Sequence, residues 1–134
     1  MPVVQSVAKI QECLVDHGAI GFAMQYEKGT GRISSLHFRI DVKGQNISFS
    51  LPVNWKKFQE CLKRDNVSRW NEDDYCYRVA WANLRDWVAS QMALLETEMV
   101  ELPQVFLPFA VGQNGQTLYD TVLEGQFLLG EGTK

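Results

Sequence analysis

The stretch EDDYCYRVAWANLRDWVASQMALLETEM, residues 72–99, decides the fold of this 134-residue chain. Asn71 just before it can cap a helix, and the acidic residues 72–74 lie where a helix dipole favours negative charge. At about 1.5 Å per residue, such a helix would run roughly 40 Å. The apolar side chains recur at spacings of three, four and seven, which predicts one continuous α-helical stripe; they are Tyr77, Trp81, Leu84, Val88, Met92, Leu95 and Met99.

The rest of the chain predicts a single α+β domain in which a three-stranded antiparallel sheet packs against helices. Hydrophobic residues make up 46% of the chain and charged residues 22%, which is typical of one globular domain. The alternation of apolar and polar residues over 19–51, interrupted by glycine turns, predicts a β-meander. The other predicted elements are a helix over 3–17, a helix over 54–64, the central helix over 72–99 and a C-terminal helical segment over 103–125.

In the first helix we expect a buried side made of Val4, Val7, Ala8, Ile10, Leu14 and Val15. In the helix over 54–64 we expect Trp55, Phe58, Cys61 and Leu62 to face inward. The meander should turn one apolar face to the helices and one polar face to solvent. That polar face would carry Gln25, Ser35, His37, Arg39, Ser48 and Ser50.

Charge divides unevenly along the chain, although the net charge is only -3. Residues 1–71 carry ten Lys or Arg against six Asp or Glu, whereas residues 72–134 carry three against ten. This asymmetry suggests two surfaces with different partners, or two parts that attract each other. Three cysteines without a spaced framework, no signal peptide and no apolar run of membrane-spanning length favour a reduced, cytoplasmic protein that does not bind membranes.

The basic first half is the first candidate site, and we predict that it binds nucleic acid. Arg69 adjoins Trp70, so a base could stack beside a phosphate contact if the indole is exposed. The alternative is a solvated helix face with Trp70 in the core. The candidate residues are His37, Arg39, Lys43, Lys56, Lys57, Lys63, Arg64, Arg69 and Trp70.

The acidic second half is the alternative site, suited to a protein partner, to self-association or to a role as an inhibitor of a host protein. Its aromatic residues either fill the core under the central helix or form an apolar patch with an acidic rim. The candidate residues are Phe106, Phe109, Glu98, Glu101 and Asp120. A related possibility is that a pocket beside the sheet sequesters a small signalling nucleotide.

Catalytic and metal-binding patterns are weak. Cys13 and His17 have a helical spacing that suits a shared metal, but no second pair accompanies them. Consecutive carboxylates such as Glu72 to Asp74 do not converge on one point of a helix. We therefore expect no metal, no cofactor and no enzymatic activity.

Two resemblances add to these predictions. The order helix, three strands, helix over residues 3–64 is similar to the double-stranded-RNA-binding domain, which implies phosphate contacts from Lys56 and Lys57, although Trp55 and Phe58 depart from that family's pattern. Residues 79–109, including DWV at 86–88 and VFLPF at 105–109, resemble a family of small uncharacterised phage and prophage proteins. That resemblance implies a protein of the bacterial host cytoplasm that acts in nucleic-acid metabolism or against a host defence system.

Overall fold

The central helix α3 (Asp73–Glu96) is the longest element of the computed structural model, which describes residues 2–113 and 115–126. Its 24 residues confirm the predicted long helix, with a later start and an earlier end. The helix ends because the Thr97 hydroxyl donates to the Leu94 carbonyl at 2.6 Å and Glu98 then takes a positive φ of 60°. Met99, predicted on the apolar stripe, therefore lies outside the helix and is exposed.

The predicted three-stranded antiparallel sheet is present, in the order β1-β2-β3. A two-residue turn, Lys43-Gly44, joins the second and third strands, and both residues have the positive φ that such tight hairpins require. In the middle of the sheet Phe38 pairs with Phe22 on one side and with Phe49 on the other. The strands are β1 (Ala19–Tyr26), β2 (Ile33–Val42) and β3 (Gln45–Pro52).

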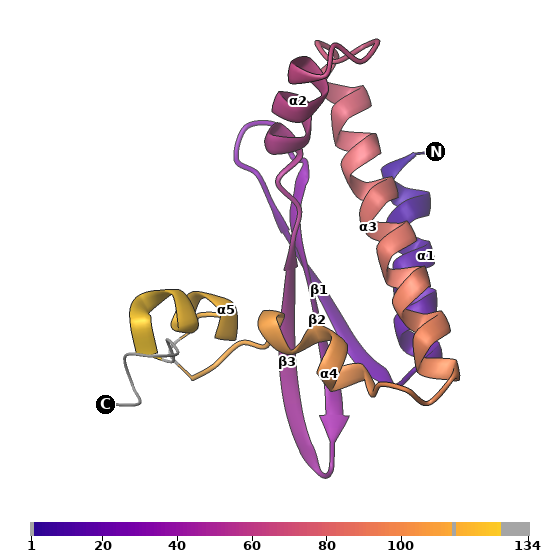
Figure 1. Cartoon of the computed structure of the whole chain (residues 1–134), viewed down its shortest axis with the longest axis vertical. Helices are drawn as coiled ribbons and strands as arrows, with labels where there is room; N and C mark the ends of the chain where they lie inside the picture. The colour runs from indigo at the N-terminus through magenta and orange to yellow at the C-terminus, as the bar shows by residue number, and fades with distance from the viewer. Residues whose placement is uncertain (1, 114, 127–134) are drawn as a thin grey trace.

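Helices α1 (Val3–Asp16) and α3 pack against each other over one face of the sheet (Figure 1). The core between these layers contains Leu36 and Phe38 from the sheet, Ile10 from α1 and Trp81 from α3. The buried side of α1 is narrower than predicted: it comprises Ser6, Val7, Ile10 and Leu14. Val4, Ala8 and Val15 were expected there and are exposed instead.

Helix α2 (Trp55–Arg64) packs on α3 beyond the end of the sheet (Figure 1). Asn54 caps its first turn by accepting from the Lys57 amide at 3.3 Å. Trp55 is buried, and its indole N–H donates to Glu27 Oε2 at 2.8 Å, which ties α2 to the turn between β1 and β2. Cys61, predicted to face inward, is exposed.

The C-terminal segment is helical only in pieces, because Ala110 and Val111 pair with other segments and the Gly115 amide then closes a turn by donating to the Gly112 carbonyl at 3.0 Å. The Val111 amide donates to the Ser48 carbonyl at 2.8 Å, and Ala110 pairs with Phe49, so this segment runs along the edge of β3. The pieces are α4 (Leu102–Phe106), η1 (Leu107–Phe109), α5 (Leu118–Thr121) and η2 (Val122–Gln126). Within the described residues, no helix combines the length and apolar character needed to cross a membrane.

Candidate functional site

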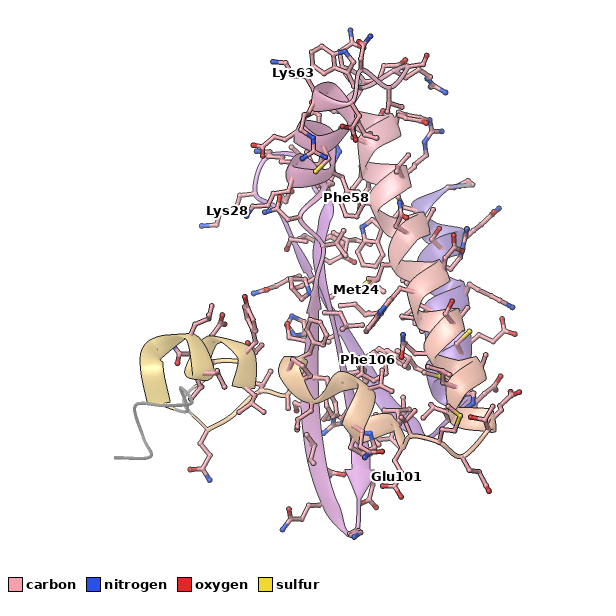
Figure 2. The ribbon with its side chains drawn as sticks, viewed as in Figure 1. Met24, Lys28, Phe58, Lys63, Glu101 and Phe106 are labelled. Carbon is pink, nitrogen blue, oxygen red and sulfur yellow. The ribbon has the colours of Figure 1, made fainter. Side chains whose placement is uncertain are left out.

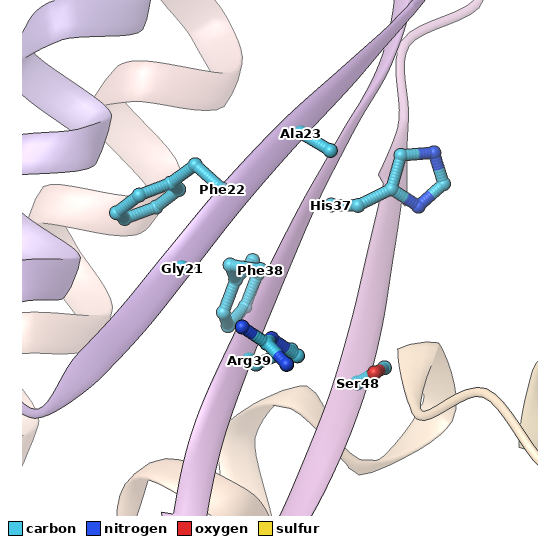
Figure 3. Close-up of a pocket in the computed structure, with 7 residues that line it drawn as sticks. All are labelled: Gly21, Phe22, Ala23, His37, Phe38, Arg39 and Ser48. Carbon is cyan, nitrogen blue, oxygen red and sulfur yellow. The ribbon is translucent and has the colours of Figure 1, made fainter.

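The sheet face turned away from the helices carries small and polar side chains and forms an open hollow of about 390 Å³. Figure 3 shows Phe22 pointing toward the helices and His37 pointing away from them, as the alternation of side chains along a strand requires. Ala23, Arg39 and Ser48 are exposed there, so the hollow is open to solvent. The residues that line it are Gly21, Phe22, Ala23, His37, Phe38, Arg39 and Ser48.

Arg39 is the cation of this open face. It stands on the central strand, paired with Gly21 on one side and with Ser48 on the other. A β-carbon at position 21 would come within 3.1 Å of Arg39 Nη2, so the glycine leaves the space in which the guanidinium lies. In the described part of the chain no hydrogen bond or ion pair is found for this guanidinium. Its charge is therefore available to an anion.

Beside Arg39, a short hydrogen-bonded chain orients His37. The Ser35 hydroxyl donates to Gln25 Oε1 at 3.1 Å, so it accepts from His37 Nε2, which lies 3.0 Å away. This arrangement leaves Nδ1 of the neutral imidazole without its proton and able to accept a hydrogen bond. The ring is thus held in one orientation on the same face as the guanidinium.

A second group of cations lies on and near α2. Lys56, Lys57 and Lys63 are exposed, and Lys56 Nζ lies 5.8 Å from the ring centre of Trp55. Figure 2 shows Lys63 at the α2 end of the molecule together with Lys28. Lys28 was not a predicted site residue, because a single lysine in a glycine-containing turn gives no signal in the sequence.

Two of the predicted cations are already paired with carboxylates. Arg64 Nε lies 3.1 Å from Asp65, and Arg69 Nε lies 2.9 Å from Glu72. The hydrogen bond from Arg69 holds the pKa of Glu72 below its usual value, and the same contact raises the pKa of Arg69. These two arginines are less available to phosphates than the lysines of α2.

Trp70 is neither fully exposed nor part of the core, so it lies between the two alternatives that the sequence analysis gave for its indole. It is partly buried, its backbone carbonyl accepts from Gln59 at 3.1 Å, and Lys63 Nζ lies 5.1 Å from its ring centre. Lys43 is separate from both groups, because its turn lies at the opposite end of the sheet from α2 (Figure 1). The nine predicted residues therefore occupy three places: the open face, the α2 end and the far turn.

One ion pair within the chain joins the basic half to the acidic half. Arg32 Nη2 lies 2.8 Å from Asp74 Oδ1, which joins the turn before β2 to the acidic start of α3. The hydrogen bond with Asp74 raises the pKa of Arg32. The basic and acidic halves thus attract each other at this contact.

The structure changes which residues could form the alternative site in the acidic half. Phe106 is fully buried, and it packs against Phe38, Phe49 and Trp87 at ring-centre distances of 5.3, 6.2 and 5.6 Å. Phe109 is partly buried. The two aromatic residues therefore do not form the exposed apolar patch that was one of the two alternatives. Glu98, Glu101 and Asp120 are exposed, and the large apolar side chains exposed in the described part of this half are instead Leu94, Met99, Leu107, Tyr119 and Leu123.

The candidate metal pair Cys13 and His17 and the buried thiol of Cys76 have structural contacts. His17 Nδ1 lies 2.9 Å from the Cys13 carbonyl oxygen, a local contact at the end of α1. Cys76 is buried, its thiol donates to the Trp70 carbonyl at 3.2 Å, and burial raises the pKa of that thiol. No group of three or more potential metal ligands occurs among residues 2–113 and 115–126.

Comparisons of the chain with protein-family models, with curated proteins and with solved structures find no match. The order helix, three strands, helix is present over residues 3–64, but it is α3 that lies beside α1 while α2 lies past the end of the sheet. The resemblances to phage proteins and to the RNA-binding domain stay predictions.

Proposed function

We propose that this protein binds single-stranded nucleic acid on the open face of its sheet and that it does so without catalysis. The observation that carries the proposal is Arg39, whose guanidinium has no partner in the described chain and lies in a solvent-open hollow made by small residues. Arginine is the side chain best suited to phosphate, because its planar fork donates two parallel hydrogen bonds.

The shape of the open face supports a single strand rather than a duplex. Gly21, Ala23 and Ser48 project little, so an extended chain of nucleotides has room to lie flat along the strands. Unpaired bases stack on histidine rings and on guanidinium planes as well as on larger aromatics, and His37 and Arg39 provide one of each. The oriented His37 ring also presents an acceptor for a base edge.

The cations at the α2 end extend this surface. From the row of Arg39 and Ser48 to the row of Ser35 and Pro52 is four residues, or roughly 13 Å along the sheet at about 3.3 Å per residue. The chain then enters α2 with Lys56 and Lys57. A nucleic-acid strand that follows β3 would pass from Arg39 to these lysines, which gives a path of several phosphates.

The phage context implied by the resemblance belongs to the same proposal. A small binding protein of this kind would act on nucleic-acid intermediates in an infected bacterial cell. The acidic residues at the start of α3, next to α2, would repel polyanions and so weaken nonspecific binding. We therefore expect a modest, salt-dependent affinity.

The test is an anisotropy titration of labelled single-stranded and double-stranded DNA and RNA at low and physiological salt. We expect binding of single strands, with at least about tenfold weaker affinity for Arg39→Glu, which is about 1.4 kcal/mol. The salt slope should also fall by about 0.7 for each phosphate that the variant no longer neutralises.

The matched control is Lys9→Glu, which changes the charge by the same amount at an exposed position of α1. It should retain the wild-type affinity within about threefold if the open face is the site. Equal reductions in affinity for both variants, or no binding at low salt, would contradict the proposal. Binding of a dinucleotide as tight as that of a longer strand would indicate a nucleotide-sequestering hollow instead.

A second candidate function is binding of a host protein through the C-terminal part. It is favoured by the exposure of Leu107, Tyr119 and Leu123 beside the acidic Asp120, an apolar surface with an acidic residue next to it. If this function is correct, Tyr119→Ala with Leu123→Ala should abolish capture of a specific lysate protein while Arg39→Glu leaves that capture unchanged.

A further inference from the structure

The two edges of the sheet differ, because another segment covers one of them and not the other. The β3 edge is covered, because residues 110–111 run along it and the Val111 amide donates to the Ser48 carbonyl at 2.8 Å. The other edge is β1, for which the described residues provide no pairing on its outer side. An uncovered edge strand offers its unpaired backbone groups to another strand.

The backbone groups that are free on β1 follow from two observed hydrogen bonds. The Val53 amide donates to the Ser34 carbonyl, so the even-numbered residues of β2 direct their backbone groups to β3 and the odd-numbered residues direct theirs to β1. His37 and Arg39 are therefore bonded to their partners Ala23 and Gly21. The contact from Val111 to Ser48 agrees, because Ser48 stands opposite Arg39 and faces away from β2.

It follows that Phe22 and Met24 direct their N–H and C=O groups outward at the free edge. These two residues lie symmetrically about Ala23, one on each side. A second β1 strand that runs antiparallel about a two-fold axis at Ala23 would place each Phe22 opposite a Met24, and each such pair exchanges two hydrogen bonds. The four outward N–H and C=O groups of each strand would then all be paired.

The middle of this strand lacks the usual protection against such pairing. Its sequence, AIGFAMQY over Ala19–Tyr26, contains no charged residue and no proline, which are the usual means of blocking an edge. The two register irregularities lie at its ends, between Ala19 and Gly21 and between Gln25 and Tyr26, so the stretch between them is regular. Exposed apolar side chains flank that stretch: Ile20 is 57% exposed and Tyr26 is 60% exposed.

Helix α1, which packs against β1, adds an apolar stripe that nothing in the described chain covers. Val4 is 77% exposed and Val15 is 54% exposed. Together with Ala8 they recur at spacings of four and seven, which places them on one side of the helix. Both the free edge and the helix next to it thus present apolar groups to solvent.

We propose that a second copy of this chain pairs with β1, antiparallel, about a two-fold axis through Ala23. The small side chains of the two Ala23 residues meet at the non-hydrogen-bonded position, where the Cα atoms are about 4.5 Å apart. On the helix side each Phe22 packs beside a Met24, so apolar side chains meet apolar ones. A second copy is the occupant because the edge complements itself: the same short segment supplies both the donors and the acceptors.

The consequence is a continuous six-stranded sheet with both open faces on one side. The two Arg39 and two His37 side chains then belong to a single surface. This inference does not depend on the proposed function, since the pairing uses only β1 and α1. The dimer would exist whether or not the face binds nucleic acid.

The first test is sedimentation equilibrium of the wild type, Ala23→Lys and Ser50→Lys. We expect the wild type at twice the chain mass of 15.3 kDa. Ala23→Lys sets two ammonium groups opposite each other, and it should weaken dimerisation at least tenfold. Ser50→Lys adds the same charge on the same face and in the same cross-strand row, two strands away from the edge, and it should remain dimeric.

The second test is site-specific oxidation in a Cys61→Ser background, which removes the exposed native thiol. Ala23→Cys should form a disulfide-linked dimer, because the expected Cα separation lies within the range that a disulfide spans. Ser50→Cys should remain unlinked. This test decides the proposal even if Ala23→Lys fails to fold. A monomeric wild type, or cross-linking at position 23 no greater than at position 50, would overturn the proposal.

Discussion

Glu27 joins three parts of the molecule through a single carboxylate. The Thr30 hydroxyl donates to Oε1 at 2.7 Å and the Trp55 indole donates to Oε2 at 2.8 Å. The hydrogen bond from Thr30 is the largest reason that the pKa of Glu27 lies below its ordinary value. The residue thus holds the β1–β2 turn closed and attaches α2 to it.

Replacement of this carboxylate should show a pH-dependent loss of stability. A group with a lowered folded pKa contributes stability above its unfolded pKa, near 4.3, and that contribution disappears as pH falls through the folded value. Glu27→Gln should therefore lower the free energy of unfolding by about 1 kcal/mol at neutral pH, and by less near pH 3. Urea unfolding at the two pH values measures this. Glu12→Gln, at an exposed carboxylate 3.9 Å from Lys9, should change stability by less than about 0.5 kcal/mol at both.

At this scale the sequence predicts which side chains share a face but not which charges are free. The alternation of β2 places His37 and Arg39 together on the polar face, as observed. The pairing of Arg32 with Asp74 joins residues 42 apart, and no periodicity contains that information. The availability of Arg39 depends on Gly21 on another strand, so it too became visible only in the folded chain.

Among the elements, α4 shows how a short helix is held by a capping box and by its buried side chains. The Glu101 amide donates to Gln104 Oε1 at 2.7 Å, which closes the first turn. Phe106 then points in between the sheet and α3 (Figure 2), and its ring packs against Trp87 at a ring-centre distance of 5.6 Å. A five-residue helix has little stability of its own. Its position is therefore set by the burial of Leu102 and Phe106 in the core.

Truncation of that ring should be among the most damaging changes in the chain. Phe106→Ala should cost about 3–5 kcal/mol, because it leaves a cavity beside Phe38 and Phe49. The neighbouring Leu107→Ala removes an exposed side chain and should cost less than about 0.5 kcal/mol. Chemical denaturation of both variants measures the difference. Similar values for the two would show that the ring is not buried as described.

Element existence was predictable wherever a long period repeats. The stripe of α3 and the alternation of the meander each extend over many residues, so the two main layers follow from the sequence. The exposed stripe of Val4, Ala8 and Val15 could not be distinguished from a buried one, because a helical period shows which residues share a face and not what lies against it. The C-terminal pieces α4, η1, α5 and η2 are too short for a helical repeat to be recognised in the sequence.

The whole molecule consists of a packed body and a small C-terminal arm. Figure 1 shows α5 beside β3 and away from the layer of helices α1 and α3. The arm is joined to the body by the extended residues near Val111, and the Leu118 amide donates to the Ala110 carbonyl at 2.8 Å. Among the described elements, α5 contacts mainly η1 and η2.

Removal of the arm should leave the body folded. A chain that ends at Gly112 keeps the contact between Val111 and Ser48, and its midpoint of thermal unfolding should fall by no more than about 5 °C. A chain that ends at Glu101 lacks α4 and the buried Phe106, and it should fail to unfold cooperatively. Circular dichroism with thermal melts compares the two. Unfolding of the longer truncation would mean that the arm is part of the core.

The layout of the two helical layers has a consequence for synthesis on the ribosome. Helix α1 leaves the ribosome before the helix that packs beside it, because α3 is complete only at Glu96, about 80 residues after α1 ends. At 5–20 residues per second, on the order of 4–16 s pass in which Ile10 and Leu14 lack that partner. The meander can form during that interval from neighbouring segments, so a nascent chain has a sheet ready before α3 arrives. Until then we expect the apolar side of α1 to remain open to chaperones.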